Sequence, residues 1–536
     1  MENEKMEKIT SFPSGLSEIP KEKFAFASSR DFVHDKKFAT KPRSYMRDAF
    51  SRFCKNKGAI VGAVVILCLL LFAIIVPFFT PYTVSYKDSN FANVLPKNKL
   101  FANTSFWDGC EEREDGKITF VYYYAMGLET GHNAVKNQEY TEKDGLYIYR
   151  LDSYHKKGMI YQNFSLEEYK ALQDYQNRTG IQVIYPTVRT TDRPQAVQDN
   201  KDANYYFKTT QKEGRTEIVY DENGDIIPVY WSYPEEFIND QYDSIRLDLP
   251  GDGRTDENGV TYYYMYARVT SSGVECRINY YEYYIYYHSQ VLKDGITEPY
   301  FLFGTTGSGQ DLLTCLASGA RFSFLFSTIV ALVNLLIGAI YGSIEGYYGG
   351  KTDLIMERIS DILSAVPVMI VITLLKLHMG GSSQALVLFL AYFLTGWIGM
   401  ASTTRMQFYR YKKQEYVLAA RTLGAKDRRI ITKHIFPNAL GTLITSCALV
   451  IPSMIYSEAN LSYLGIINLS TGSVTSVGTL IAAGREALTT SPHIALFPSI
   501  FLALLMLSFN LFGNGLRDAF NPVSYTHLTL PTNSRV

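Results

Sequence analysis

The chain has 536 residues, more than a single domain of ordinary size holds. Lysine plus arginine and aspartate plus glutamate number 52 each, and the mean hydropathy is near zero. These averages exclude neither a membrane protein nor a soluble one, because they mix two kinds of sequence. Residues 59–79 and 320–513 are rich in apolar runs, whereas residues 83–300 are polar and crowded with tyrosine. We therefore interpret the chain as a membrane protein with a large water-exposed insert.

The first apolar run, residues 59–79, predicts a transmembrane helix, because it is uncharged and long enough to cross about 30 Å of hydrocarbon. A cleaved signal peptide fits poorly, since 58 residues precede the run and no small-residue cleavage site follows it. Arg52, Lys55 and Lys57 stand just before the run. The positive-inside rule then places segment 1–58 in the cytoplasm and the chain after the run outside.

The insert, residues 83–300, predicts a folded extracytoplasmic α+β domain. Two tyrosine-rich, β-favouring stretches, 261–270 and 275–287, flank a Ser-Ser-Gly sequence, which indicates a hairpin. Asn223-Gly224 between two further β-like runs indicates another.

A short helix is predicted after Ser165, because Glu168 follows three residues later and completes a capping box. The many tyrosines allow two interpretations. They either form a ligand-binding surface, since the ring packs while the hydroxyl bonds, or fill half-buried strand positions.

Cys110 and Cys276 are the two cysteines of the insert. Outside the cytoplasm such a pair can oxidise, so a Cys110–Cys276 disulfide is a hypothesis. Two free thiols are the alternative, because the sequence does not show how far apart they lie.

Five further spans are predicted in a helical core, residues 301–522. The densest basic loop of this part, residues 405–437, belongs in the cytoplasm by the positive-inside rule. Six spans then place both termini in the cytoplasm. The five predicted ranges are 321–341, 354–375, 385–402, 439–459 and 494–512.

Sequence motifs for catalysis and metal binding are absent: the chain has no HExxH and no paired CxxC. Residues 345–353 resemble a phosphate loop, but Glu345 stands where that pattern needs glycine. We interpret these glycines as a turn at the membrane face. The chain is thus expected to hold no metal, no cofactor and no ATP site, and to be no enzyme.

The basic loop itself predicts two short helices. Good helix formers fill 414–423, Gly424 is a natural stop, and a second helical stretch covers 426–436. Pro437 fits the first turn of the next helix, where a missing N–H costs little. Either the loop only fixes the topology, or its small residues shape a surface that seats in the groove of a partner.

At this loop the sequence resembles the membrane subunits of ABC importers, which carry the pattern E-A-A-x3-G-x9-I-x-L-P. Ala419, Ala420, Gly424 and Pro437 match the pattern at the right spacing. The glutamate falls on Leu418, with Glu415 one turn earlier; the isoleucine and leucine positions hold His434 and Phe436.

Further motifs in order are similar to the C-type permease subunit of oligopeptide and dipeptide importers. The similarity covers about residues 40–80 and 300–522, and the insert exceeds the usual first external loop of the family. The motifs are GTTGSGQDLL, GARFSF, EGYYGGKTDLIMERISDILSAVP, EANLSYLGI, VGTLIAAGR and FNLFGNGLRDAFNP.

The resemblance implies a type I ABC importer permease in a bacterial cell membrane. It implies a second, B-type permease subunit, two cytoplasmic ATPases that hold ATP and Mg²⁺, an extracytoplasmic binding protein and a peptide substrate, with no nucleic acid. The residues implied to couple to an ATPase are Glu415, Ala419, Ala420, Gly424 and Pro437.

Polar residues within spans often mark a translocation path, so Asn334, Glu458 and Asn460 are candidates. Glu458 and Asn460 are expected near an outer gate. The alternative is that such groups lie between packed helices. The tail, residues 523–536, resembles an artefactual end of a reading frame, with a genuine tail as the alternative.

Two other classes of function stay open. A membrane-anchored sensor or receptor would use the insert as its ligand-binding unit, and a surface enzyme is the third class. The ordered motifs favour the permease.

Overall fold

The computed structural model describes residues 45–101, 104–188, 203–234, 251–381, 383–470 and 475–520. The predictions for most of segment 1–58 and for the tail lie outside the described residues. The chain divides into two compact units, Met1–Arg52 and Phe53–Val536. In the first unit the described residues belong to helix α1 (Tyr45–Phe53), where Asp48 and Arg52 form an ion pair one turn apart.

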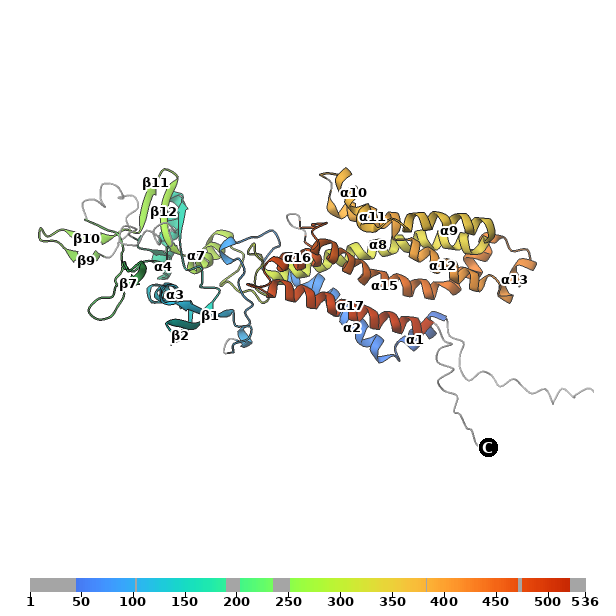
Figure 1. Ribbon diagram of the computed structural model, residues 1–536, viewed down its shortest axis with the longest axis horizontal. Coiled ribbons are helices and arrows are strands. Elements are labelled where there is room, and N and C mark those ends of the chain that lie inside the picture. Colours follow the sequence, from blue (N-terminus) through green and yellow to red (C-terminus); the bar gives the residue numbers. More distant parts are fainter. Residues whose placement is uncertain are drawn as a thin grey trace, which may run out of the picture. The chain divides into compact units, whose positions relative to one another are not determined.

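Five described helices of the second unit are long and apolar enough to cross a membrane, and a bent pair would make a sixth if it counts as one span. The helices run alongside one another as a bundle (Figure 1). The five are α2 (Lys57–Phe79), α8 (Leu312–Tyr348), α11 with α12 (Gln384–Thr395, Ile398–Tyr411), the run α14–η7–α15 (Asp427–Arg429, Ile430–Ile435, Phe436–Tyr463) and α17 (His493–Phe520).

The predicted span 354–375 is not one straight helix. Helices α9 (Gly350–Ser364) and α10 (Val368–His378) meet at an angle of 69°. Pro367 stands at the break with an extended ψ of 129°. Proline disfavours the helical conformation of the residue before it and lacks an N–H, so a helix ends here.

Helix α8 is longer than the predicted 321–341, because its start is set by a cap rather than by hydropathy. Asp311 accepts a hydrogen bond of 2.8 Å from the backbone N–H of Thr314. A carboxylate in this position satisfies an N–H that has no partner within the helix.

Close packing of α8 on α12 depends on three glycines spaced four residues apart, Gly338, Gly342 and Gly346. A Cβ atom on Gly338 would lie 2.6 Å from Cβ of Met400, and one on Gly346 would lie 2.7 Å from Cβ of Phe408. Small residues in a stripe let helix backbones approach within a membrane, where no hydrophobic effect drives helices together. These positions therefore admit only glycine at this helix separation.

The described residues of the insert form small antiparallel sheets and three α-helices. The sheet β1-β3-β2 (Cys110–Gly116, Leu146–Asp152, Val135–Lys143) packs against α3 (Lys117–Thr130) around one apolar core. The sheet β11-β12-β4 (Ala267–Thr270, Gly273–Asn279, Met159–Phe164), with β5 (Ile184–Tyr185) also on β12, packs against α4 (Leu166–Thr179) around another. Two further sheets are the three-stranded β8-β10-β9 (Ser232–Pro234, Thr261–Tyr264, Gly251–Thr255) and the two-stranded β6-β7 (Thr209–Lys212, Arg215–Ile218).

The predicted hairpin signals are confirmed in part. Thr270 pairs with Gly273 at the β11–β12 turn, and Gly224 has the left-handed φ of +87° that its turn needs. The stretch 261–270, however, is split between two sheets, and 275–287 turns from strand into helix α7 (Tyr280–Tyr286). Asn279 causes the switch, because its side chain accepts from the N–H of Tyr281 and starts the helix.

The predicted capping box is present: Ser165 and Glu168 bond reciprocally at the start of α4. The predicted disulfide is wrong. Cys110 and Cys276 are both free thiols, on β1 and β12 in different sheets. Burial raises the pKa of the Cys110 thiol to about 12, so the reactive thiolate is disfavoured.

Candidate functional site

The loop between α12 and α15 begins with helix α13 (Glu415–Thr422), which ends in a Schellman motif. The N–H of Gly424 donates to the carbonyl of Arg421 and the N–H of Ala425 to that of Ala420, each at 3.0 Å. Gly424 has a φ of +81°, which glycine adopts without strain. The predicted stop is confirmed, and the carbonyl of Ala420 is the acceptor that closes it.

The second predicted helix, 426–436, is not separate from the span that follows. Asp427–Tyr463 is one continuous helix with a π-helical turn at η7. Pro437 lies in the first turn of α15, where it cannot donate to the carbonyl one turn back. The π-helical turn lies just before this proline, and the N–H of Phe436 donates to the carbonyl of Ile431, five residues back.

The π-helical turn changes which side chains face the bundle. Ile430 and Ile435, five residues apart, are both fully buried, and Ile431 is half-buried. Ile431 packs against the same buried cluster as Ile430 and Ile435. Residues 405–411, the first part of the predicted loop 405–437, are helical and belong to α12.

The loop is held firmly to the bundle. Val417 is the buried residue of α13 and packs with Tyr347 of α8 and Phe408 of α12. The hydroxyl of Tyr347 donates to Oδ1 of Asp427 at 2.6 Å and accepts from Nη2 of Arg421 at 3.1 Å. A displacement of α13 must therefore move the ends of α8 and α15 with it.

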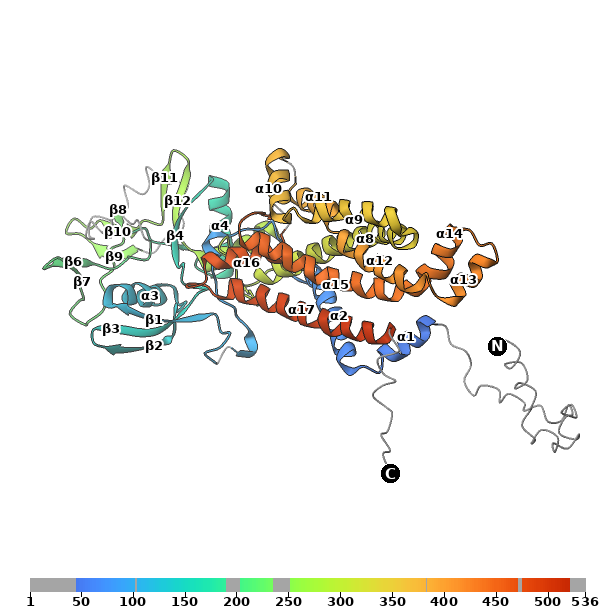
Figure 2. The same cartoon turned by 45° about the vertical axis from the view of Figure 1, so that its right-hand side comes forward.

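The rest of α13 is open to a partner. Leu418 is 48% exposed and Leu423 88% exposed, and Glu415 and Ala419 are also exposed. Helices α13 and α14 lie at the end of the bundle away from α16 (Val477–Glu486) (Figure 2). Exposed basic side chains surround the apolar ones: Arg421, Lys426, Arg428 and Arg429. Protruding leucines in a basic rim are typical of a protein-binding surface.

An ion cluster beside this surface escaped the sequence analysis. Arg405 of α12 bonds both oxygens of Asp353, at 2.6 and 3.0 Å, and both oxygens of Glu357, at 3.0 Å each. Tyr409 donates to Asp353 at 2.5 Å. From the sequence, Arg405 was only one of the basic residues that place the loop in the cytoplasm. Asp353 belonged to the stretch that resembles a phosphate loop. No spacing rule links residues 52 positions apart.

The three translocation candidates are not gathered into one site. Glu458 is buried and accepts hydrogen bonds from Ser476, Ser462 and Ser323 at 2.7, 3.1 and 3.4 Å. It thus joins α8, α15 and α16. Asn460 is half-buried on the same helix.

Asn334 lies apart from this group. Ser323 and Asn334 are on the same helix, separated by eleven residues or about 16 Å. Asn334 is 1% exposed beside Gly396, and its amide group has no hydrogen-bond partner among the described residues. A path-lining role for these residues stays a prediction.

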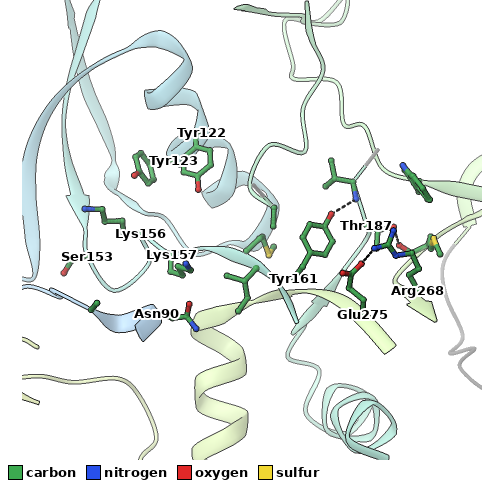
Figure 3. A pocket seen from close by; sticks show the side chains of 17 residues that line it. Asn90, Tyr122, Tyr123, Ser153, Lys156, Lys157, Tyr161, Thr187, Arg268 and Glu275 are labelled. Carbon is green, nitrogen blue, oxygen red and sulfur yellow. Dashed lines mark hydrogen bonds and ion pairs between the residues drawn. The ribbon is translucent and has the colours of Figure 1, made fainter. Parts of the chain in front are cut away.

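The insert contains a cleft of about 840 Å³. Tyr122, Tyr123, Lys156 and Lys157 lie on one side of the cleft, and the pair Arg268–Glu275 lies on the other with Tyr161 (Figure 3). The cleft is where a ligand of the insert would bind if the tyrosines formed a binding surface.

The bundle and its loop define the class of the protein: a polytopic membrane permease. Residues 334–523 match the family of the binding-protein-dependent transport system inner membrane component, and residues 44–98 match the N-terminal transmembrane domain of oligopeptide transport permease C. The chain belongs to the family of C-type oligopeptide and dipeptide transport permeases.

Two relatives illustrate the membership. The oligopeptide transport system permease protein of Bacillus subtilis is 43% identical over 220 residues, which is 41% of this chain and 71% of the relative. The dipeptide transport system permease protein of Lactococcus lactis is 40% identical over 223 residues, 41% of this chain and 64% of its own. Among solved structures, a chain of the inward-facing MetNI methionine ABC transporter aligns with 39% of this chain and 96% of its own length. The sequence identity is 16% and the TM-score is 0.30.

Proposed function

We propose that the chain is the C-type permease subunit of an ATP-driven peptide importer. It pairs with a B-type permease subunit to form the translocation path. Two cytoplasmic ATPases supply ATP hydrolysis and hold ATP and Mg²⁺, and an extracytoplasmic binding protein delivers peptide. The chain itself holds no nucleotide. Family membership and the relatives named above support this assignment.

The observation that carries the proposal is the open face of α13. Leu418 and Leu423 project from a helix whose single buried side chain, Val417, is fixed in the bundle. This surface seats in a groove of an ATPase. The family pattern places a glutamate at position 418, where this chain has leucine, so the contact here is apolar rather than charged.

Coupling follows from the continuity of Asp427–Tyr463. Closure of the ATPases displaces α13, and the Tyr347–Asp427 bond passes the displacement to the start of this helix. The helix spans 37 residues, about 55 Å, and carries Glu458 near its other end. The subunit can then rock as a body between two states, provided that the ATPases interact differently with each.

The topology belongs to the same proposal. The bent pair α9–α10 counts as one span, which gives six. Both termini and the α13 surface are cytoplasmic in a bacterial cell membrane, and the insert is extracytoplasmic. The excess of Lys and Arg around α13 supports this orientation.

Gly424→Val tests the assignment, because a β-branched residue disfavours the left-handed conformation that ends α13. We expect peptide uptake into proteoliposomes to fall at least tenfold, with the ATPases either lost on purification or hydrolysing ATP without transport.

Gly381→Val is the matched control. Gly381 also has a positive φ, +90°, and open space around it, but it follows α10, away from α13 in the sequence. Normal uptake by the Gly424 variant would overturn the role of the loop. Equal loss in both variants would show a general folding defect.

A further inference from the structure

The ends of α2 and α17 mark the level of the membrane surface on the side of the insert. The two helices run antiparallel: a Cβ atom on Gly62 of α2 would lie 2.6 Å from the carbonyl oxygen of Ser508, and farther along α2 Phe72 contacts Phe501. Phe79, the last residue of α2, lies seven residues or about 10 Å beyond Phe72. Phe497 lies four residues or about 6 Å beyond Phe501 in the same direction. Phe497 is therefore at the edge of the hydrocarbon layer.

Aromatic side chains of the insert and of the residues directly after it pack on this edge. Phe303 stacks on Phe497 with ring centroids 4.1 Å apart, and the ring of Trp107 lies 5.7 Å from Phe497. The indole N–H of Trp107 donates to the carbonyl of Leu302 at 2.6 Å. Phe101 stacks on Trp107 at 6.2 Å. The indole N–H of Trp107 thus has a hydrogen-bond partner, and the Trp107 ring holds the residues around it at the membrane end of α17.

Residues close to Trp107 in the chain expose large apolar side chains. Phe106 contacts the rings of both Phe101 and Trp107, yet it is 67% exposed, and Leu100 is 88% exposed. Lys99 lies beside Leu100 with its side chain 72% exposed and paired with Glu298. Aromatic rings flanked by lysine at a membrane edge are typical of interfacial anchors.

We propose that Leu100 and Phe106 insert into the interfacial layer of the bilayer leaflet on the side of the insert. The occupant of this surface is phospholipid, because Phe106 contacts Trp107, which packs on Phe497 at the membrane end of α17. The end of α2 on the same side also exposes apolar rings, since Phe78 and Phe79 are 77% and 83% exposed. The anchor ties the insert to the bilayer surface beside α17. The proposal needs only that α2 and α17 cross the membrane, and it is independent of the peptide substrate.

Quenching by brominated lipids tests the contact. The chain has three tryptophans, Trp107, Trp231 and Trp397. A single probe is made in the full chain by Phe106→Trp with all three replaced by Phe, and the transporter is reconstituted in phosphatidylcholine–phosphatidylglycerol nanodiscs. We expect lipids brominated near the headgroup to quench this probe at least twofold, and more than lipids brominated near the chain end.

Two matched single-tryptophan proteins calibrate the result. One keeps only Trp231 of the insert, which is not quenched, and the other keeps only Trp397 between α11 and α12, which reports the deeper label. Leu100→Trp in the tryptophan-free background is a second probe if the first variant does not fold. Absence of quenching at both positions would overturn the proposal. Blue-shifted emission without quenching would also overturn it and indicate a protein occupant.

Discussion

Tyr347 in the last turn of α8 donates a hydrogen bond of 2.6 Å to Asp427 in the first turn of the helix that becomes α15. The two residues are 80 positions apart. Their contact joins the helical loop, which is otherwise open to a partner, to two long helices of the bundle. In the coupling proposed above, this bond is the link through which a force on α13 would reach the membrane.

Tyr347→Phe removes this bond and leaves the ring in place. Because the acceptor is a carboxylate, we expect a loss of about 1.5–3 kcal/mol in local stability. Coupling should weaken more than folding: uptake per ATP hydrolysed falls several-fold while the ATPases still co-purify. Tyr348→Phe is the control, since Tyr348 is 56% exposed on the neighbouring position. Equal coupling ratios in the two variants would show that the bond does not transmit force.

Arg405→Ala should destabilise the contact between α9 and α12. It leaves Asp353 and Glu357 close together without their shared cation, at a cost of about 1–3 kcal/mol. The apparent melting temperature in detergent should fall. Arg358→Ala removes an ion pair whose partners, Arg358 and Asp361, are mostly exposed, so it should change the melting temperature little.

Neutralising the carboxylates should rescue the Arg405 variant. Adding Asp353→Asn and Glu357→Gln to Arg405→Ala removes the repulsion, and part of the melting temperature should return. A triple variant less stable than Arg405→Ala would show that the cost comes from lost packing instead of unpaired charge.

Arg277→Ala should unfold the insert. Arg277 is fully buried and bonds both oxygens of Glu129, at 2.5 and 2.6 Å. Removing one partner of a buried pair costs about 3–5 kcal/mol, because the other charge is left in the interior. Limited proteolysis of the intact chain should then cut within residues 83–300.

Arg268→Ala is the matched control, since the Arg268 side chain is 50% exposed in its pair with Glu275 and should tolerate removal. We expect the ATPases to co-purify with both variants, because the proposed ATPase contact is at α13 and not in the insert. Loss of the ATPases from the Arg277 variant would contradict the independence of insert and loop.

Acid should destabilise the insert through His155. Burial, aided by the positive charges of His132 and Lys97, lowers the pKa of His155 from 6.5 to about 3. The unfolded state binds this proton below pH 6.5 and the folded state does not, so stability falls as pH drops from about 6.5 toward 3. Between pH 6 and pH 5 the loss is about 1 kcal/mol.

Urea unfolding of the insert in the intact chain, followed by proteolysis at these two pH values, measures the effect. His155→Gln should flatten the pH dependence. His378→Gln replaces an exposed histidine at the end of α10 and should leave the pH dependence unchanged. A wild-type insert equally stable at both pH values would contradict the burial of a neutral His155.

Local signals in the sequence were sufficient for several elements. The uncharged run 59–79 predicted α2, Gly424 predicted the end of α13, and Ser165 with Glu168 predicted the start of α4. Each depends on hydropathy or on hydrogen bonds between residues at most a few positions apart, so the side chains that decide the outcome are visible together. The order and spacing of the motifs likewise indicated the family.

Tertiary structure alone decided the contacts between distant residues. Arg405 donates hydrogen bonds to Asp353, Tyr347 donates to Asp427, and Cys110 lies on a different sheet from Cys276. The π-helical turn at 430–435 also depends on what Ile430 and Ile435 pack against. The sequence by itself determined which segments are helical, apolar or charged, because those properties are local. Which of them meet depends on how helices pack at glycine-lined faces, and no spacing along the chain encodes that.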